Sequence, residues 1–216
     1  MTKIKAVIFD MDGVLVDAKE WHFDALNRAL ALFGFHISQL EHVRDYDGLP
    51  TRHKLEMLTQ KRGLPSSLHR FINQMKQTYL YEIVEQQCVP NPQHIETLHR
   101  LREEGFSVAL ASNSIRRSVD LLMERTDLAQ FMQCTFSNED VALPKPHPEI
   151  YQLTMQRLGF LPEECLVVED GLYGIQAAQQ AGAHVHRVDT VHDVHYAGIC
   201  QTIQQLESQT PLRRAV

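Results

Sequence analysis

The strongest constraint on the fold is a short, β-branched apolar run near the N-terminus that lies far from any other strand-like segment. Residues 4–9 are typical of a buried strand, and the run stops at Asp10 and Asp12. The next comparable run begins only at Phe106. Between the two runs the chain has a helical pattern. The first strand therefore belongs to the same sheet as the later strands, and a helical block lies between them in the sequence.

The helical block extends from about residue 17 to residue 87. Asp17 is predicted to be the N-cap of a first helix, in which apolar side chains recur at helical spacing until Gly34. Two more helices are predicted, one over residues 51–63 and one from about Ser66 onward.

After Val89 the pattern alternates between short apolar strands and helices of about ten residues, which is typical of βαβ units and a parallel sheet. Ser114 is predicted to cap one of these helices, and the chain after Leu206 is predicted to be frayed. The further strands are expected at residues 106–111, 134–136, 166–168 and 185–188. The predicted class is α/β, with a Rossmann-like parallel-sheet core over residues 1–16 and 88–216 and an inserted all-helical domain over residues 17–87.

The composition excludes several classes of protein. The chain has 216 residues, with 21 Lys and Arg against 27 Asp and Glu, so its formal charge is −6. This acidic balance does not favour nucleic acid or anionic membranes as partners. No apolar run reaches the length of a membrane span, and no signal peptide is evident. The four cysteines are scattered, which favours reduced thiols in the cytoplasm. We expect a monomer or a weak homodimer.

Chemically active side chains follow three of the predicted strands. Such groups collect at the carboxyl ends of parallel strands, where clustered carboxylates need a cation to stay ionised. Oxygen ligands without cysteine or histidine suit Mg²⁺, and hydroxyl, amide and lysine donors suit a phosphoryl group. The residues are Asp10 and Asp12 after the first strand, Ser112 and Asn113 after the second, Glu169 and Asp170 after the strand at 166–168, and Lys145 in a loop.

The order of these residues resembles the four motifs of the haloacid dehalogenase superfamily. The helical insertion after the first motif is similar to the class I cap of its phosphatases and β-phosphoglucomutases. The resemblance covers nearly the whole chain. It implies a Rossmann-like fold, Mg²⁺ as the cofactor and a small phosphorylated metabolite as the substrate.

The resemblance also implies a role for each residue. Asp10 would be the nucleophile that takes the phosphoryl group, and Asp12 the general acid and base. Ser112 and the amide of Asn113 would hold phosphoryl oxygens, and Lys145 would neutralise the charge on the nucleophile and the phosphoryl group. The implied metal ligands are Asp10, the backbone carbonyl of Asp12 and Asp170, with Glu169 binding the metal directly or through water.

Four residues of the helical insertion are candidates for substrate contact. His22 lies where many members of the superfamily that act on sugar phosphates carry a histidine that faces the active site. A solvated surface histidine is an interpretation of equal weight. The mutases use an arginine to bind a second phosphate, and the corresponding position here is Thr51, with Arg52 next to it. Lys76 is a further possible phosphate contact, although a lysine on an exposed helix face is the simpler interpretation.

The predicted function is therefore Mg²⁺-dependent hydrolysis of a small phosphorylated metabolite, such as a sugar phosphate, through an aspartyl phosphate. The alternative enzyme is a β-phosphoglucomutase-like isomerase. A non-catalytic binding or regulatory protein is the alternative of another class. That alternative expects a lost nucleophile or acid, and this sequence keeps Asp10 and Asp12.

Overall fold

The chain divides into two compact units, which are described separately. The computed structural model describes residues 3–209. The first unit, called the core unit, comprises Met1–Asp17 and Pro90–Val216. The second, called the helical unit, comprises Ala18–Val89. Each unit contains a hydrophobic cluster of its own.

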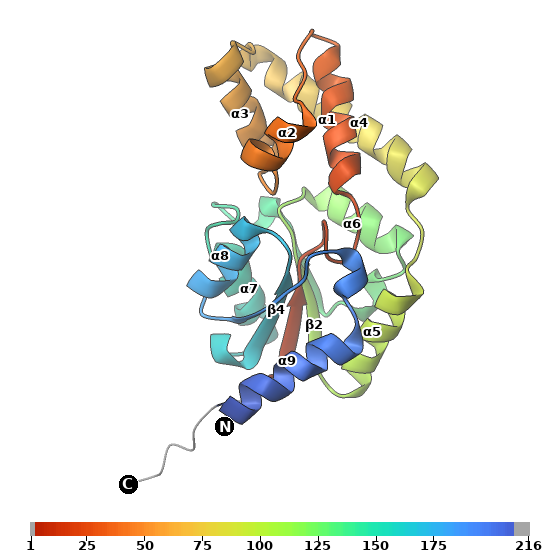
Figure 1. The fold of residues 1–216 in the computed structure, drawn as a ribbon, viewed down its shortest axis with the longest axis vertical. Helices are drawn as coiled ribbons and strands as arrows, with labels where there is room; N and C mark the ends of the chain where they lie inside the picture. Colours follow the sequence, from red (N-terminus) through yellow and green to blue (C-terminus); the bar gives the residue numbers. More distant parts are fainter. Residues whose placement is uncertain (1–2, 210–216) are drawn as a thin grey trace. The chain divides into compact units, whose positions relative to one another are not determined.

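The core unit is built on a parallel sheet in the strand order β3-β2-β1-β4-β5 (Figure 1). Strand β1 is central and pairs with both β2 and β4. Its side chains are fully buried, as expected for a parallel strand covered on both faces. The predicted α/β fold class is confirmed. The strands are β1 (Ala6–Phe9), β2 (Ser107–Ala111), β3 (Cys134–Phe136), β4 (Cys165–Glu169) and β5 (His184–Arg187).

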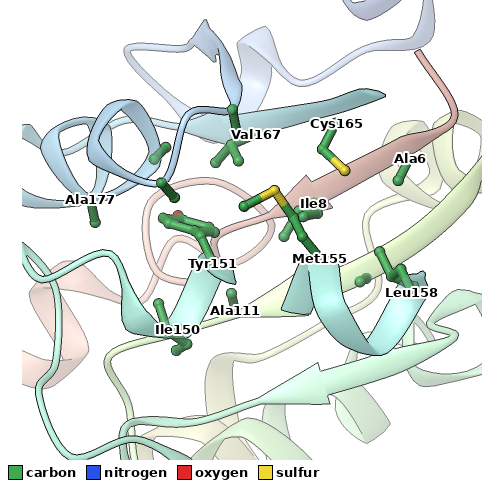
Figure 2. Close-up of a cluster of buried hydrophobic side chains, with 14 residues drawn as sticks. Ala6, Ile8, Ala111, Ile150, Tyr151, Met155, Leu158, Cys165, Val167 and Ala177 are labelled. Carbon is green, nitrogen blue, oxygen red and sulfur yellow. The ribbon is translucent and has the colours of Figure 1, made fainter. Parts of the chain in front are cut away.

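Helices cover both faces of this sheet. On one face α7 and α8 pack over small and apolar strand residues, and Figure 2 shows Met155 and Tyr151 from α7 among them. Helix α5 packs against β2 and α9. No helix within residues 3–209 has the length and apolar character that a membrane span requires. The helices are α5 (Pro92–Glu103), α6 (Arg116–Arg125), α7 (Glu149–Leu158), α8 (Leu172–Gln180) and α9 (Tyr196–Gln209).

The helical unit buries a cluster that includes Leu26, Leu30, Leu55 and Leu58 from two of its helices. Helix α3 begins after a proline and ends at Gly63, whose φ of +71° lies in the left-handed region that favours glycine. The elements are α1 (Lys19–Ala31), α2 (Gln39–Glu41), a π-helical segment (His42–Tyr46), α3 (Thr51–Arg62) and α4 (His69–Gln87).

Several local predictions were wrong. Helix α1 has Ala18 at its N-cap rather than Asp17, and α6 has Ile115 at its N-cap rather than Ser114. The chain is not frayed directly after Leu206, because α9 continues to Gln209 and buries apolar side chains such as Ile199. The rest of the predicted frayed tail, residues 210–216, lies outside the described residues.

A buried histidine near the start of α5 joins distant segments of the core unit. His94 is 1% exposed, with Nδ1 3.1 Å from the carbonyl oxygen of Leu15 and Nε2 2.8 Å from that of Val191. Burial is the main reason why the pKa of His94 falls below its usual 6.5, and it outweighs the opposing effect of the two carbonyls. The folded protein therefore favours neutral His94.

This depressed pKa predicts a pH dependence of stability. Below pH 6.5 the unfolded chain binds a proton at His94 more readily than the folded chain does. The contribution of neutral His94 to the free energy of unfolding is therefore complete above pH 6.5 and is lost as the pH falls. We expect the free energy of unfolding, measured in urea between pH 7.5 and 5.5, to fall less steeply in His94→Gln than in the wild type. His99→Gln, on the exposed side of the same helix, should keep the wild-type slope. Equal slopes in all three proteins would contradict this account.

Candidate active site

The register of the sheet brings the ends of three strands together. Phe9 pairs with Leu110 on one side and with Val168 on the other. The residues that follow, including Asp10 and Glu169, therefore emerge at the same edge of the sheet. Asp10 continues the pairing, because its backbone N–H donates to the carbonyl of Val168 at 3.0 Å. Its side chain is nearly buried.

A tight turn follows β1 and positions the second aspartate. The carbonyl of Met11 accepts hydrogen bonds from three backbone N–H groups, including that of Val16 at 2.9 Å. Gly13 donates to the carbonyl of Val16 at 2.7 Å and has a φ of +92°, a conformation that side chains larger than glycine rarely adopt. The turn places Asp12 beside Asp10.

Lys145 joins two strand ends through its side chain. Its Nζ lies 2.6 Å from Oδ1 of Asp10 and 2.6 Å from Oε1 of Glu169, and the lysine is 3% exposed. The backbone of Lys145 is held by the side-chain amide of Asn113, which accepts from its N–H at 3.0 Å and donates to its carbonyl at 3.2 Å. The peptide bond from Lys145 to Pro146 is cis. Asn113 thus fixes the loop that delivers the lysine.

Burial and charge shift the pKa values of this cluster. Burial is the largest cause of the raised pKa of Asp10, the nearby Glu169 carboxylate adds to it, and the Lys145 ammonium opposes it. Burial alone would lower the pKa of Lys145, but the two carboxylates outweigh it and raise the pKa above its usual value. Lys145 is therefore a stable cation that compensates part of the negative charge.

Three carboxylates at this edge form a group that fits a metal ion. Asp10, Glu169 and Asp170 each offer a ligand oxygen, and these oxygens lie within 4.8 Å of one another. The donor set contains only oxygen, which suits a hard divalent cation such as Mg²⁺. The residues present therefore fit the metal that the sequence motifs imply.

A serine after β2 contacts the second aspartate. The hydroxyl of Ser114 donates to Oδ2 of Asp12 at 2.7 Å, and its backbone N–H donates to the hydroxyl oxygen of Ser112 at 3.0 Å. Ser112 is 1% exposed. Ser114 therefore orients Asp12 instead of capping α6, because the tertiary hydrogen bond to a carboxylate is stronger than a local capping bond.

Two residues of this site were not predicted from the sequence. Tyr151, on α7, donates its hydroxyl to Oε1 of Glu169 at 2.6 Å. Gly174, on α8, lies so close to the same side chain that a Cβ there would be 1.7 Å from Oε1 of Glu169. The sequence contained one usable signal, since Tyr151 lies four residues before Met155 on the buried face of its helix.

The candidate substrate residues of the helical unit have different environments. Lys76 is 4% exposed, and its Nζ lies 2.7 Å from Nδ1 of His22, so the interpretation of Lys76 as an exposed lysine was wrong. Arg52 has an 86% exposed side chain, and it pairs with Glu56 on its own helix. Thr51 is the first residue of α3. The structure therefore brings together Lys76 and His22, whereas Arg52 faces solvent.

Comparison with known proteins identifies the family. The sequence model of the Haloacid dehalogenase-like hydrolase family matches residues 7–188, and the chain belongs to this family. It is similar to a phosphorylated carbohydrates phosphatase of Thermotoga maritima, with 32% identity over 83% of this chain and 82% of the relative. A phosphoglycolate phosphatase of Salmonella typhimurium is 29% identical over 84% of this chain and 80% of the relative. The prediction of an enzyme of this family is confirmed.

Solved structures agree on the fold. The CbbY protein of Rhodobacter sphaeroides has a TM-score of 0.81 at 20% identity, covering 91% of this chain and 99% of that chain. A β-phosphoglucomutase of Clostridium difficile has a TM-score of 0.82 at 18% identity, covering 95% of this chain and 100% of that chain. The haloacid dehalogenase-like fold predicted from the motifs is confirmed.

The contact between α8 and Glu169 generates a prediction. Helix propensity alone favours Gly174→Ala by about 1 kcal/mol. The Cβ would, however, overlap the Glu169 carboxylate, and relieving that overlap costs about 3 kcal/mol or more. We expect a net loss of about 2 kcal/mol or more in the free energy of unfolding, measured by urea denaturation.

Gly171→Ala is the matched control. Gly171 is the N-cap of the same helix, has an ordinary φ of −95°, and a Cβ there meets no atom within 4 Å. Its substitution should cost no more than about 1 kcal/mol. Equal losses in the two variants, or a gain in Gly174→Ala, would show that the overlap is not the controlling effect.

Proposed function

We propose that the protein is a phosphatase that hydrolyses small phosphorylated metabolites through an aspartyl-phosphate intermediate. The observation that carries this proposal is the buried Lys145, which lies 2.6 Å from Asp10 and holds that aspartate at the edge of an acidic cluster. The relatives named as phosphatases support the same reaction class.

Asp10 acts as the nucleophile. A carboxylate oxygen of Asp10 forms a bond to phosphorus while the bond from phosphorus to the leaving oxygen breaks. Asp12 gives its proton to that leaving oxygen. In the second half of the reaction Asp12 takes a proton from the attacking water, whose oxygen bonds to phosphorus while the bond from phosphorus to Asp10 breaks, and inorganic phosphate is released. The hydroxyl of Ser114, 2.7 Å from Oδ2 of Asp12, orients the proton carrier for both steps.

The remaining groups balance charge. Lys145 places a cation beside the nucleophile and the transferring group, and the hydroxyl of Ser112 is a donor for a phosphoryl oxygen. The carboxylates of Asp10 and Asp170, with the backbone carbonyl of Asp12, are the proposed Mg²⁺ ligands. The ion would supply charge neutralisation for the phosphoryl oxygens.

Sugar phosphates are the first substrate class to test. The relative from Thermotoga maritima is named for phosphorylated carbohydrates and shares 32% identity with this chain. Isomerisation needs an intermediate that is protected from water while the substrate turns over. Arg52 is paired with Glu56 in solvent and Thr51 lies where the mutases carry an arginine, so hydrolysis is the reaction favoured over isomerisation.

The substitution Asp10→Asn tests the nucleophile. It keeps the shape of the side chain but removes the attacking charge, so turnover should fall by about three orders of magnitude or more. The assay measures phosphate release and product isomerisation over a panel of sugar phosphates, phosphoglycolate and β-glucose 1-phosphate. Unaltered turnover in a pure, folded Asp10→Asn sample would exclude this route. Rapid isomerisation with almost no phosphate release would favour the mutase.

Metal removal tests the acidic cluster. Excess chelator should abolish phosphate release, and Mg²⁺ should restore it, because the clustered carboxylates repel an anionic substrate without a cation. Asp170→Asn should raise the Mg²⁺ concentration for half-maximal turnover by about tenfold or more. Asp120→Asn, on the exposed face of α6, is the control and should leave this concentration unchanged. Full turnover in metal-free protein would contradict the assignment.

A further inference from the structure

Glu169 is held on every side by hydrogen-bond donors of the core unit. Its Oε1 accepts from Nζ of Lys145 at 2.6 Å and from the hydroxyl of Tyr151 at 2.6 Å. Its Oε2 faces the backbone N–H of Asp170 at 3.1 Å and that of Gly171 at 3.4 Å. The residue is 2% exposed. A buried carboxylate with this set of donors is fixed in one orientation.

Tyr151 contributes more than one contact to this arrangement. Its ring lies under the lysine, with Nζ of Lys145 4.8 Å from the ring centroid, a distance typical of a cation–π interaction. The side chain is fully buried within the apolar cluster of α7 and α8 (Figure 2). Burial, with the carboxylate of Glu169 as the second cause, raises the pKa of Tyr151 well above its usual value, so the hydroxyl keeps the proton that it donates.

The backbone of α8 completes the enclosure. The absent side chain at Gly174 lets the helix approach Glu169, because a Cβ would lie 1.7 Å from Oε1 and 2.4 Å from Oε2. The carboxylate therefore has little freedom to turn toward another partner. Its charge is directed to Lys145 and to the helix N-terminus.

We propose that Tyr151 is a positioning residue that acts through Glu169 to hold Lys145 against Asp10. The proposal rests on the proposed function, in which Lys145 neutralises the nucleophile and the phosphoryl group. Tyr151 itself touches no reacting atom. Removing its hydroxyl leaves the Glu169 carboxylate short of a donor, and the carboxylate then draws the ammonium away from Asp10.

The test begins with Tyr151→Phe, which removes only the hydroxyl. We expect kcat and kcat/KM to fall together by about tenfold, the size of one hydrogen bond to a charged group, with KM unchanged within about threefold. Tyr46→Phe, a buried tyrosine of the helical unit, is the control and should keep the wild-type kcat. Failure of the wild type to turn over any substrate would refute the proposed function instead.

A double-mutant cycle separates this role from simple core packing. If Tyr151 acts through Glu169, adding Tyr151→Phe to Glu169→Gln should change kcat by less than about twofold. Where turnover of Glu169→Gln is too slow to assay, the inhibition constant of orthovanadate is compared between the wild type and Tyr151→Phe. This constant should rise about tenfold in Tyr151→Phe, because the lysine that faces the phosphoryl group is displaced.

Metal binding without substrate supplies the last readout. The dissociation constant of Mg²⁺, measured by calorimetry, should stay within about threefold of the wild type in Tyr151→Phe. A rise of about tenfold or more would overturn the proposal, because it would show that Tyr151 acts on the metal site rather than on the position of Lys145. The proposal would also be overturned if Tyr151→Phe kept the wild-type kcat and only lowered the melting temperature. Multiplicative losses of kcat in the double mutant would overturn it as well, because either result would leave Tyr151 a core residue only.

Discussion

The site depends on one buried cation between two buried carboxylates. Lys145 is 3% exposed and lies 2.6 Å from both Asp10 and Glu169. Breaking such a pair from one side leaves an uncompensated charge, which is strongly destabilising. Neighbouring side chains hold the lysine and its carboxylate partners in place. Asn113 holds the lysine backbone, and Tyr151 holds one carboxylate. The carboxylates that Lys145 does not neutralise lie where they can bind a divalent cation.

Much of the core unit could be predicted because its signals are local. Each strand is a short apolar run, and parallel strands must end at one edge, so the proximity of Asp10 and Glu169 follows from strand assignment. The motif order supplied the rest of the acidic cluster. Helix α9 was missed because residues 196–209 mix polar and apolar residues, and the helix owes its stability to packing against α5.

The errors concern side chains whose partners lie far away in the sequence. Ser114 has the ordinary features of a helix cap, but its partner Asp12 is 102 residues away. Lys76 was taken for a surface residue by its charge, although it lies four residues after the buried Ile72 on the same helix face. Tyr151 gave no signal beyond its helix position, since only the folded sheet brings Glu169 to its hydroxyl. Sequence periodicity predicts which face of a helix is buried, but the residue that a side chain contacts is known only from the tertiary structure.

The central position of β1 has a consequence for how the chain is made. This strand is synthesised before the other strands of the sheet, and one of its edges is covered when β2 appears at Ser107–Ala111. The other edge stays unpaired until β4 is made at Cys165–Glu169, and Asp10 has no ion-pair partner until Lys145 is made. During synthesis the growing chain therefore carries an apolar strand with an open edge, a feature that promotes aggregation and slow, non-local folding. A fragment that ends before β4 would keep that edge open permanently.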